Sequence, residues 1–242
     1  MPLRTLSTAE QKVETVAIIC RKHNLLFIMS PRTACTAIGQ LLCQYYDGEF
    51  LPRKDILDCR GFIAVQKKHS TLAELIAHNL LTEEEAKSLL KLAAVRNPYD
   101  SLVSLYLKKR YKYQSLLSDP SSWVNRLPGY ANDMRYSQKK SFNQWSCRMS
   151  YKKVIKALLG LRPSMYADHT RGVDIVLHYE SIEHDLKEVF MKNGIEWKAD
   201  IPKVNRTDER VHRDYRSFYS RPAALAVGLA YRYDLKTYGY KF

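Results

Sequence analysis

The sequence predicts an α/β fold, a single domain with a mostly parallel central sheet flanked by helices. Three short apolar runs, at residues 25–29, 92–95 and 173–177, are each followed by a helical pattern. Runs of this length are typical of strands buried on both faces, and their alternation with helices favours a parallel sheet. A length of 242 residues suits one domain. We therefore expect a single domain over residues 1–242.

Capping residues support several of the expected helices. Thr82 precedes three glutamates, which is a typical helix start. Asn97 suits an N-cap, Pro98 suits the first helical position, and Gly194 suits the residue that follows a helix. Residues 114–144 hold prolines and scattered aromatics and are predicted to be irregular. Helices are predicted at residues 8–22, 36–46, 72–78, from Thr82 onward, and at 97–113, 182–193 and 222–238.

The charge and the cysteines limit the functional classes. Lys and Arg exceed Asp and Glu by 14, so the surface attracts anions such as nucleic acid, acidic membranes, acidic glycans or a phosphate-bearing cofactor, unless it is merely a solvated basic surface. Five scattered cysteines show no metal spacing and indicate free thiols in a reducing compartment. The polar residues 1–12 and the lack of a long apolar run predict a cytoplasmic protein without a membrane anchor.

The first candidate site is the segment at residues 30–36, Ser-Pro-Arg-Thr-Ala-Cys-Thr, between a strand and a helix. In α/β folds, ligands bind at the carboxyl ends of the strands, and amide groups at a helix start bind anions. Arg32 adds a permanent charge, and Thr33 and Thr36 add hydroxyl groups. The glycines and the Lys-Ser/Thr pair of the nucleotide P-loop are absent, which argues against a kinase or GTPase. The alternative is an ordinary connection with a surface arginine.

The second candidate site follows the strand at residues 92–95. Arg96 stands at the strand end, and Ser104 lies about two turns into the next helix. A guanidinium and a hydroxyl in these places can meet at one phosphate above the strand ends. The alternative is a capped helix with a surface arginine. Residues 178–180 follow the third predicted strand, so they should lie at the same edge of the sheet as the two candidate sites.

Residues 94–106, Ala-Val-Arg-Asn-Pro-Tyr-Asp-Ser-Leu-Val-Ser-Leu-Tyr, resemble the 3'-phosphate motif of sulfotransferases that use 3'-phosphoadenosine 5'-phosphosulfate (PAPS). The closest resemblance is to the carbohydrate branch of that family. It implies a P-loop-like sulfotransferase fold, PAPS as the donor and the bisphosphate PAP as the product. It also implies that Arg96 and Ser104, within the motif at residues 92–113, bind the 3'-phosphate. Segments 173–186, 201–207, 215–219 and 234–242 resemble further family patterns.

The resemblance makes residues 24–47 the 5'-phosphosulfate loop and its helix. The implied cofactor contacts there are Arg32, Thr33, Ala34, Cys35, Thr36 and Ala37. Arg32 stands where the family has lysine, and Ala34 stands where it has glycine, so a catalytically silent relative is one alternative. Arg32 is our candidate for stabilising the leaving phosphate. No metal is implied, because arginines can take the role of a cation.

A histidine is the expected base, because imidazole changes its charge near neutral pH. His69 lies in Lys-Lys-His-Ser-Thr at residues 67–71, and related chains have a similar segment that can supply the base. Glu180, at a strand end, is the second candidate. Arg206 and Tyr215 are expected to contact the cofactor, with the Tyr215 ring stacked on adenine.

The aromatic and basic residues 114–165 are expected to cover the acceptor. The expected acceptor is a hydroxyl or amine of a small metabolite, for example in bacterial natural product biosynthesis, or of a saccharide. A nucleic-acid-binding module is the other alternative, although no RRM, KH or zinc pattern is present. The sequence does not indicate an oligomeric state.

Overall fold

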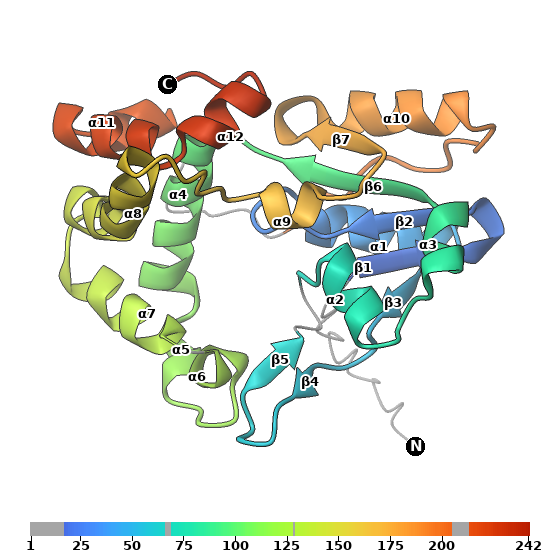
Figure 1. Ribbon diagram of the computed structural model, residues 1–242, viewed down its shortest axis with the longest axis horizontal. Helices are drawn as coiled ribbons and strands as arrows, with labels where there is room; N and C mark the ends of the chain where they lie inside the picture. Colours follow the sequence, from blue (N-terminus) through green and yellow to red (C-terminus); the bar gives the residue numbers. More distant parts are fainter. Residues whose placement is uncertain (1–16, 66–68, 128, 205–212) are drawn as a thin grey trace, which may run out of the picture.

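The central sheet has five strands in the order β3-β1-β2-β6-β7 (Figure 1). The computed structural model describes residues 17–65, 69–127, 129–204 and 213–242. The strands of this sheet are β1 (Ala17–Cys20), β2 (Leu25–Ile28), β3 (Glu49–Leu51), β6 (Leu90–Val95) and β7 (Ile175–His178). A separate two-stranded sheet pairs β4 (Ile56–Leu57) with β5 (Ile63–Val65).

The middle of the sheet is parallel and its other side is antiparallel. β6 pairs in parallel with β2 and with β7, whereas β1 pairs antiparallel with β2 and β3. β2 is apolar and buried along its length, and β6 is apolar and buried from Leu92 to Val95, as expected for strands covered on both faces. The predicted α/β class is confirmed, with a mixed sheet whose core is parallel. The three parallel strands end at the same edge, which brings together the segments that follow them.

Helices cover both faces of the sheet. Ile38 and Phe190 belong to the core on one face, and Leu75 and Leu89 belong to the core on the other. A second apolar core, around Trp145, joins helices α4, α8 and α11 beside the sheet (Figure 1). The helices are α1 (Cys35–Tyr45), α2 (Leu72–Ala77), α3 (Glu83–Ser88), α4 (Pro98–Leu107), α5 (Gln114–Leu117), α6 (Trp123–Arg126), α7 (Tyr130–Lys139), α8 (Phe142–Leu158), α9 (Ala167–Thr170), α10 (Ile182–Lys192), α11 (Arg221–Ala230) and α12 (Arg232–Thr237).

Two predictions about local structure are wrong. The described end of the predicted helix at residues 8–22 is strand β1 and a 3₁₀ turn, because its run of Ile and Ala is buried between β2 and β3. Residues 114–144 contain α5, α6 and α7 and the start of α8 instead of irregular chain. These helices are short or polar, and packing of residues such as Val124 and Met134 stabilises them.

Two predicted helices are interrupted. The helix after Asn97 changes to a π-helical turn over Lys108–Lys112, and the final helix breaks at Tyr231, between α11 and α12. π-helical turns within α-helices are frequent at functional sites. Here the turn follows directly on the helix that carries Ser104.

Candidate active site

The loop after β2 has an unusual backbone. Arg32 has φ 69° and Ala34 has φ 58°, both in the left-handed region. The Thr33 hydroxyl is buried and donates to the Ser30 carbonyl at 2.9 Å, which closes the loop. A left-handed conformation costs a residue with a side chain about 1–2 kcal/mol. This conformation explains why glycine suits the position of Ala34.

Helix α1 begins directly after this loop without a side-chain cap. Its N-cap is Ala34, whose side chain makes no capping hydrogen bond. The Ala37 amide donates to the Ala34 carbonyl at 2.8 Å. Cys35 is buried and Thr36 is half-buried at the same turn. The uncapped N-terminus, together with the positive end of the helix dipole, suits an anion.

Arg96, at the end of β6, is held rigidly. It is 5% exposed, and its Nε and Nη2 atoms contact Asp100 Oδ2 at 2.8 and 2.7 Å. Its Nη1 atom donates to the Arg32 carbonyl at 3.1 Å, and its guanidinium lies 3.9 Å from the centre of the Tyr179 ring. These contacts join the end of β6 to the loop after β2. Stacking and bidentate bonding are interactions that arginine makes better than lysine.

The two predicted phosphate motifs meet at Arg32 and Ser104. The Arg32 Nη2 atom donates a hydrogen bond to the Ser104 hydroxyl. The Arg32 Nε atom is buried without a hydrogen-bond partner among the described residues. Burial, and then the neighbouring Arg96 charge, lower the pKa of Arg32. A half-buried guanidinium that faces a second guanidinium is stabilised by a bound anion.

His69 lies beside the same loop. Its Nδ1 atom is 2.7 Å from the Met29 carbonyl, directly after β2. A carbonyl only accepts, so Nδ1 carries the proton in the neutral ring and Nε2 carries the lone pair. This tautomer suits a base at Nε2. His69 has φ 76°, and its carbonyl lies 3.2 Å from His169 Nε2.

The remaining predicted residues lie in different places. Glu180 accepts hydrogen bonds from the Asn97 amide at 3.0 Å and the Tyr240 hydroxyl at 2.8 Å, so both of its carboxylate oxygens bond to the protein. Tyr215 stacks on Tyr99 and accepts from the Asn97 side chain at 3.2 Å, which places it one residue from Arg96. Arg206 lies outside the described residues.

The sequence interpretation missed a buried polar group around Lys109. Lys109, in the π-helical turn, is 4% exposed and pairs with Asp133 at 2.5 Å. Asp133 also accepts from Trp145 Nε1 at 3.1 Å, and the Lys109 ammonium lies 4.1 Å from the centre of the Tyr130 ring. Burial raises the pKa of Tyr130, and the nearby Arg32 charge opposes that shift. Tyr130 therefore links this group to the loop after β2.

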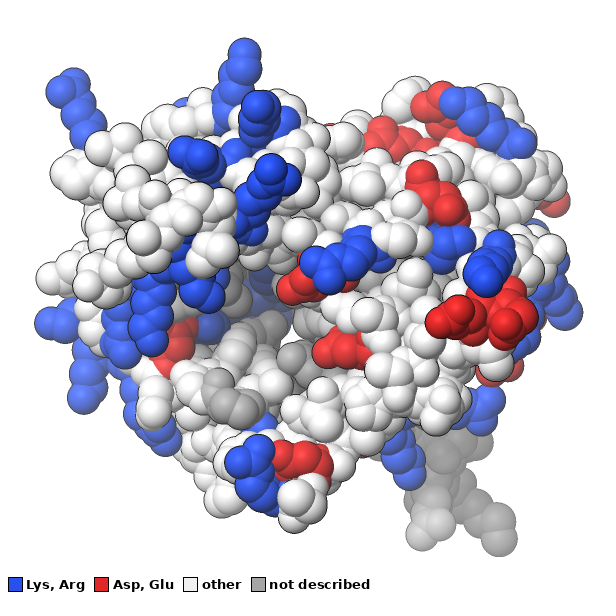
Figure 2. All heavy atoms as spheres, in the orientation of Figure 1, with Lys and Arg blue, Asp and Glu red and all other residues white. Residues whose placement is uncertain are grey.

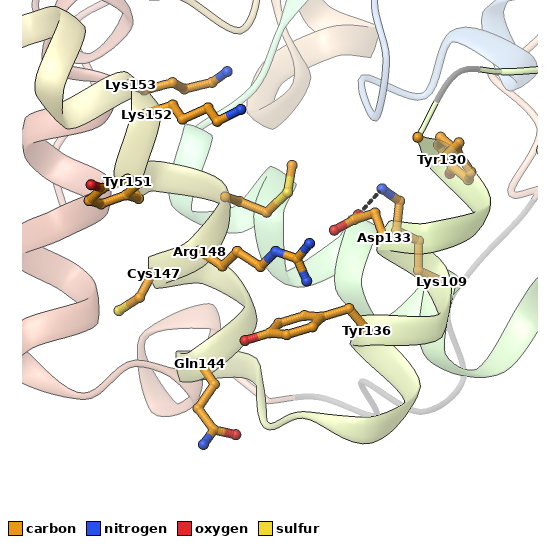
Figure 3. Close-up of a pocket in the computed structure, with 12 residues that line it drawn as sticks. Lys109, Tyr130, Asp133, Tyr136, Gln144, Cys147, Arg148, Tyr151, Lys152 and Lys153 are labelled. Atoms are coloured by element: carbon orange, nitrogen blue, oxygen red, sulfur yellow. Dashed lines mark hydrogen bonds and ion pairs between the residues drawn. The ribbon is translucent and has the colours of Figure 1, made fainter.

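This group forms one end of a pocket between α7 and α8, with a cavity volume of about 920 Å³ (Figure 3). At the other end, Lys152 and Lys153 project from α8. Between them the Arg148 guanidinium lies 4.0 Å from the centre of the Tyr136 ring. Tyrosine rings and cations suit a polar or anionic ligand. Apart from Lys109, the residues that line the pocket fall within the segment 114–165 that was expected to cover the acceptor.

The buried imidazole of His169 predicts a pH-dependent loss of stability. Burial lowers the pKa of His169 from 6.5, despite the opposing effects of its bond to the His69 carbonyl and of the Glu74 and Asp168 charges. Below pH 6.5 the unfolded chain binds a proton at His169 that the folded chain does not. The free energy of unfolding therefore falls until the pH reaches the lowered pKa, by at most about 1.4 kcal/mol per pH unit.

Urea unfolding between about pH 7.5 and 5 would measure this loss. In His169→Gln, the Gln amide can still donate to the His69 carbonyl and does not titrate, so the dependence on pH should be shallower. His78→Gln, at an exposed histidine, is the matched control. Equal dependence on pH in His169→Gln and the wild type would contradict the prediction.

Comparison with known proteins places the chain in a family. The sequence model of the Sulfotransferase family matches residues 16–241. No curated protein and no solved structure matches the chain. The predicted family is confirmed. Within the part of the chain that the structure describes, no helix has both the length and the apolar character needed to cross a membrane.

Proposed function

The chain belongs to the sulfotransferase family, and from this we propose that it transfers a sulfuryl group from PAPS to a hydroxyl or amine acceptor. The observation that carries the choice of donor is the meeting of Arg32, Ser104 and Arg96 beside the uncapped start of α1. Two guanidiniums, a hydroxyl and the backbone amides at a helix start suit a ligand with two separated phosphate groups.

The residues present fit PAPS. The buried Arg32 Nε atom has no hydrogen-bond partner among the described residues, and a ligand oxygen would supply one. Arg96 and Ser104 would hold the 3'-phosphate. Arg32 and the amides of residues 33–36 would hold the 5'-phosphosulfate. Tyr215 is our candidate for contact with the adenine, because it lies beside Asn97.

In the mechanism, PAPS when bound supplies the activated sulfuryl group. Arg32 stabilises the negative charge that develops on the leaving phosphate, which is where a preorganised cation lowers a barrier most. His69 holds its Nδ1 proton against the Met29 carbonyl and receives the acceptor proton at Nε2. Asp100 orients Arg96, and Thr33 holds the loop closed through the Ser30 carbonyl.

The pocket between α7 and α8 is our candidate acceptor site. Tyr130 lines it and lies close enough to Arg32 for the two to influence each other's pKa. Its tyrosines and cations suit a saccharide or a polar small metabolite. Five free cysteines are compatible with action in the reducing cytoplasm, which is part of this proposal.

Ser104→Ala should weaken the binding of adenosine 3',5'-bisphosphate by about tenfold or more, because the phosphate loses a charge-assisted hydrogen bond. Calorimetric titration measures this, with ATP as the control ligand. Ser101→Ala is the matched control variant: Ser101 is buried on the same helix, but its hydroxyl lies 2.6 Å from the Tyr166 hydroxyl. It should bind the bisphosphate as the wild type does.

Arg96→Ala extends this test and should abolish measurable bisphosphate binding. Because Arg96 also pairs with the buried Asp100, its thermal unfolding must be followed in parallel. Wild-type protein that binds ATP as well as the bisphosphate, or neither of them, would contradict the proposed donor. Tight bisphosphate binding without turnover of PAPS in a screen of acceptors would instead indicate a catalytically silent relative.

A further inference from the structure

The outward side of α8 carries an exposed apolar stripe. Ile155, Leu158 and Leu159 are between 41% and 74% exposed. Leu158 and Leu159 follow Ile155 by three and four residues, which places all three on one face of the helix. Trp145 and Ala157, on the opposite face, are buried. The stripe is therefore not part of the core, although each of its side chains is large and apolar.

Helix α11 also exposes large apolar side chains. It packs against α8, and its Leu225 and Leu229, one turn apart, are 66% and 37% exposed. The two helices lie together at the edge of the molecule, away from the sheet (Figure 1). We call the outward side of this pair the α8–α11 face. Exposed groups of large apolar side chains mark interaction surfaces in soluble proteins.

Basic residues gather around the α8–α11 face. Residues 134–167, which also include part of α7 and part of the pocket between α7 and α8, contain eight Lys or Arg and no Asp or Glu. Lys156 is exposed beside the apolar stripe, and Lys152 is exposed at the pocket. Figure 2 shows mainly Lys and Arg over the part of the molecule that holds α7, α8 and α11, whereas most Asp and Glu of this view lie over the sheet and α10.

We propose that the α8–α11 face binds the surface of a bilayer that contains anionic phospholipid. Leucines beside lysines are the pattern by which a helix lies in the headgroup region, with apolar side chains below it and cations at the phosphates. A second copy of this face would bring like charges together, which disfavours a dimer through it. A nucleic acid or an acidic glycan would match the cations but leave the leucines in water.

Vesicle sedimentation tests this with the full-length protein. Vesicles of phosphatidylcholine alone should bind little protein, and vesicles with about a third phosphatidylserine should bind it in a salt-sensitive manner. Leu158→Ser combined with Leu159→Ser should weaken binding about tenfold or more. The matched control is Met191→Ser: Met191 is 74% exposed, but it lies on α10. It should bind as the wild type does.

Charge-reversal variants test the electrostatic contribution to vesicle binding. Lys156→Glu should weaken binding about fivefold or more, and Lys192→Glu, which makes the same change in net charge on α10, should weaken it much less. Bisphosphate binding and thermal unfolding of each variant show that the fold is intact, because none of these residues lies in the candidate active site.

Several outcomes would overturn the proposal. One is the absence of binding to the anionic vesicles. Another is equal binding by the leucine variant and the wild type. A third is a dimer, seen in ultracentrifugation, that the leucine variant abolishes while vesicles bind no protein. None of these results depends on catalysis, so the proposal can fail while the proposed function stands.

Discussion

Replacing Arg32 with alanine should lower the rate of sulfuryl transfer by about 10²–10³. Arg32 is the cation at the start of α1, and charge builds on the leaving phosphate only as the bond to sulfur breaks. An interaction that strengthens in the transition state appears in kcat, so kcat should fall more than bisphosphate affinity. Release of the bisphosphate from PAPS measures this rate, and water can serve as the acceptor until another is found.

Two further variants make the result specific. Arg32→Lys should keep part of the activity, because lysine retains the positive charge. It loses the planar guanidinium, whose Nη2 donates to Ser104 while its Nε is left to donate to a ligand. Arg53→Ala removes an exposed arginine that pairs only with Glu49 among the described residues, and it should leave the rate unchanged. An Arg32→Ala enzyme within about threefold of the wild type would rule out this role.

That the segments after β2 and β6 lie together was predictable, because it depends on strand order. Both segments follow short apolar runs, and parallel strands place such segments at one edge. The hydrogen bond from Arg96 to the Arg32 carbonyl joins them. The partner of Ser104 was not predicted: the sequence paired it with Arg96, whereas in the structure its hydroxyl accepts a hydrogen bond from Arg32. The roles of these residues in binding the donor stay predictions.

The contacts of Tyr130, Asp133 and His169 were not predictable. They come from segments without a motif, and their positions depend on how short helices pack. The π-helical turn that buries Lys109 has no sequence signal, because Lys-Lys-Arg-Tyr-Lys is typical of a solvated helix. Strand β1 was missed for a similar reason: a short apolar run suits either a helix or a strand, and pairing with β2 decides between them.

Replacing His69 with asparagine should lower kcat for a hydroxyl acceptor by about 10²–10⁴, because the acceptor proton loses its base. Asparagine removes the base while it keeps the local structure. Its amide can donate to the Met29 carbonyl as Nδ1 does, and asparagine tolerates the positive φ of this position. Thermal unfolding and bisphosphate affinity should therefore stay close to those of the wild type. His69→Ala, which loses the Met29 contact as well, should be less stable.

The dependence of kcat on pH separates a base from a structural residue. In the wild type, activity should fall at acidic pH as the base becomes protonated, and His69→Asn should lack this acid limb while its residual rate rises with hydroxide. His78→Asn, at an exposed histidine, should keep the wild-type profile. The measurement uses labelled PAPS with the first hydroxyl acceptor found by screening saccharides and small alcohols. If His69→Asn kept the acid limb unchanged, a group other than His69 would be the base that receives the acceptor proton. Glu180 is a poor candidate for that group, because both of its oxygens already accept hydrogen bonds from Asn97 and Tyr240.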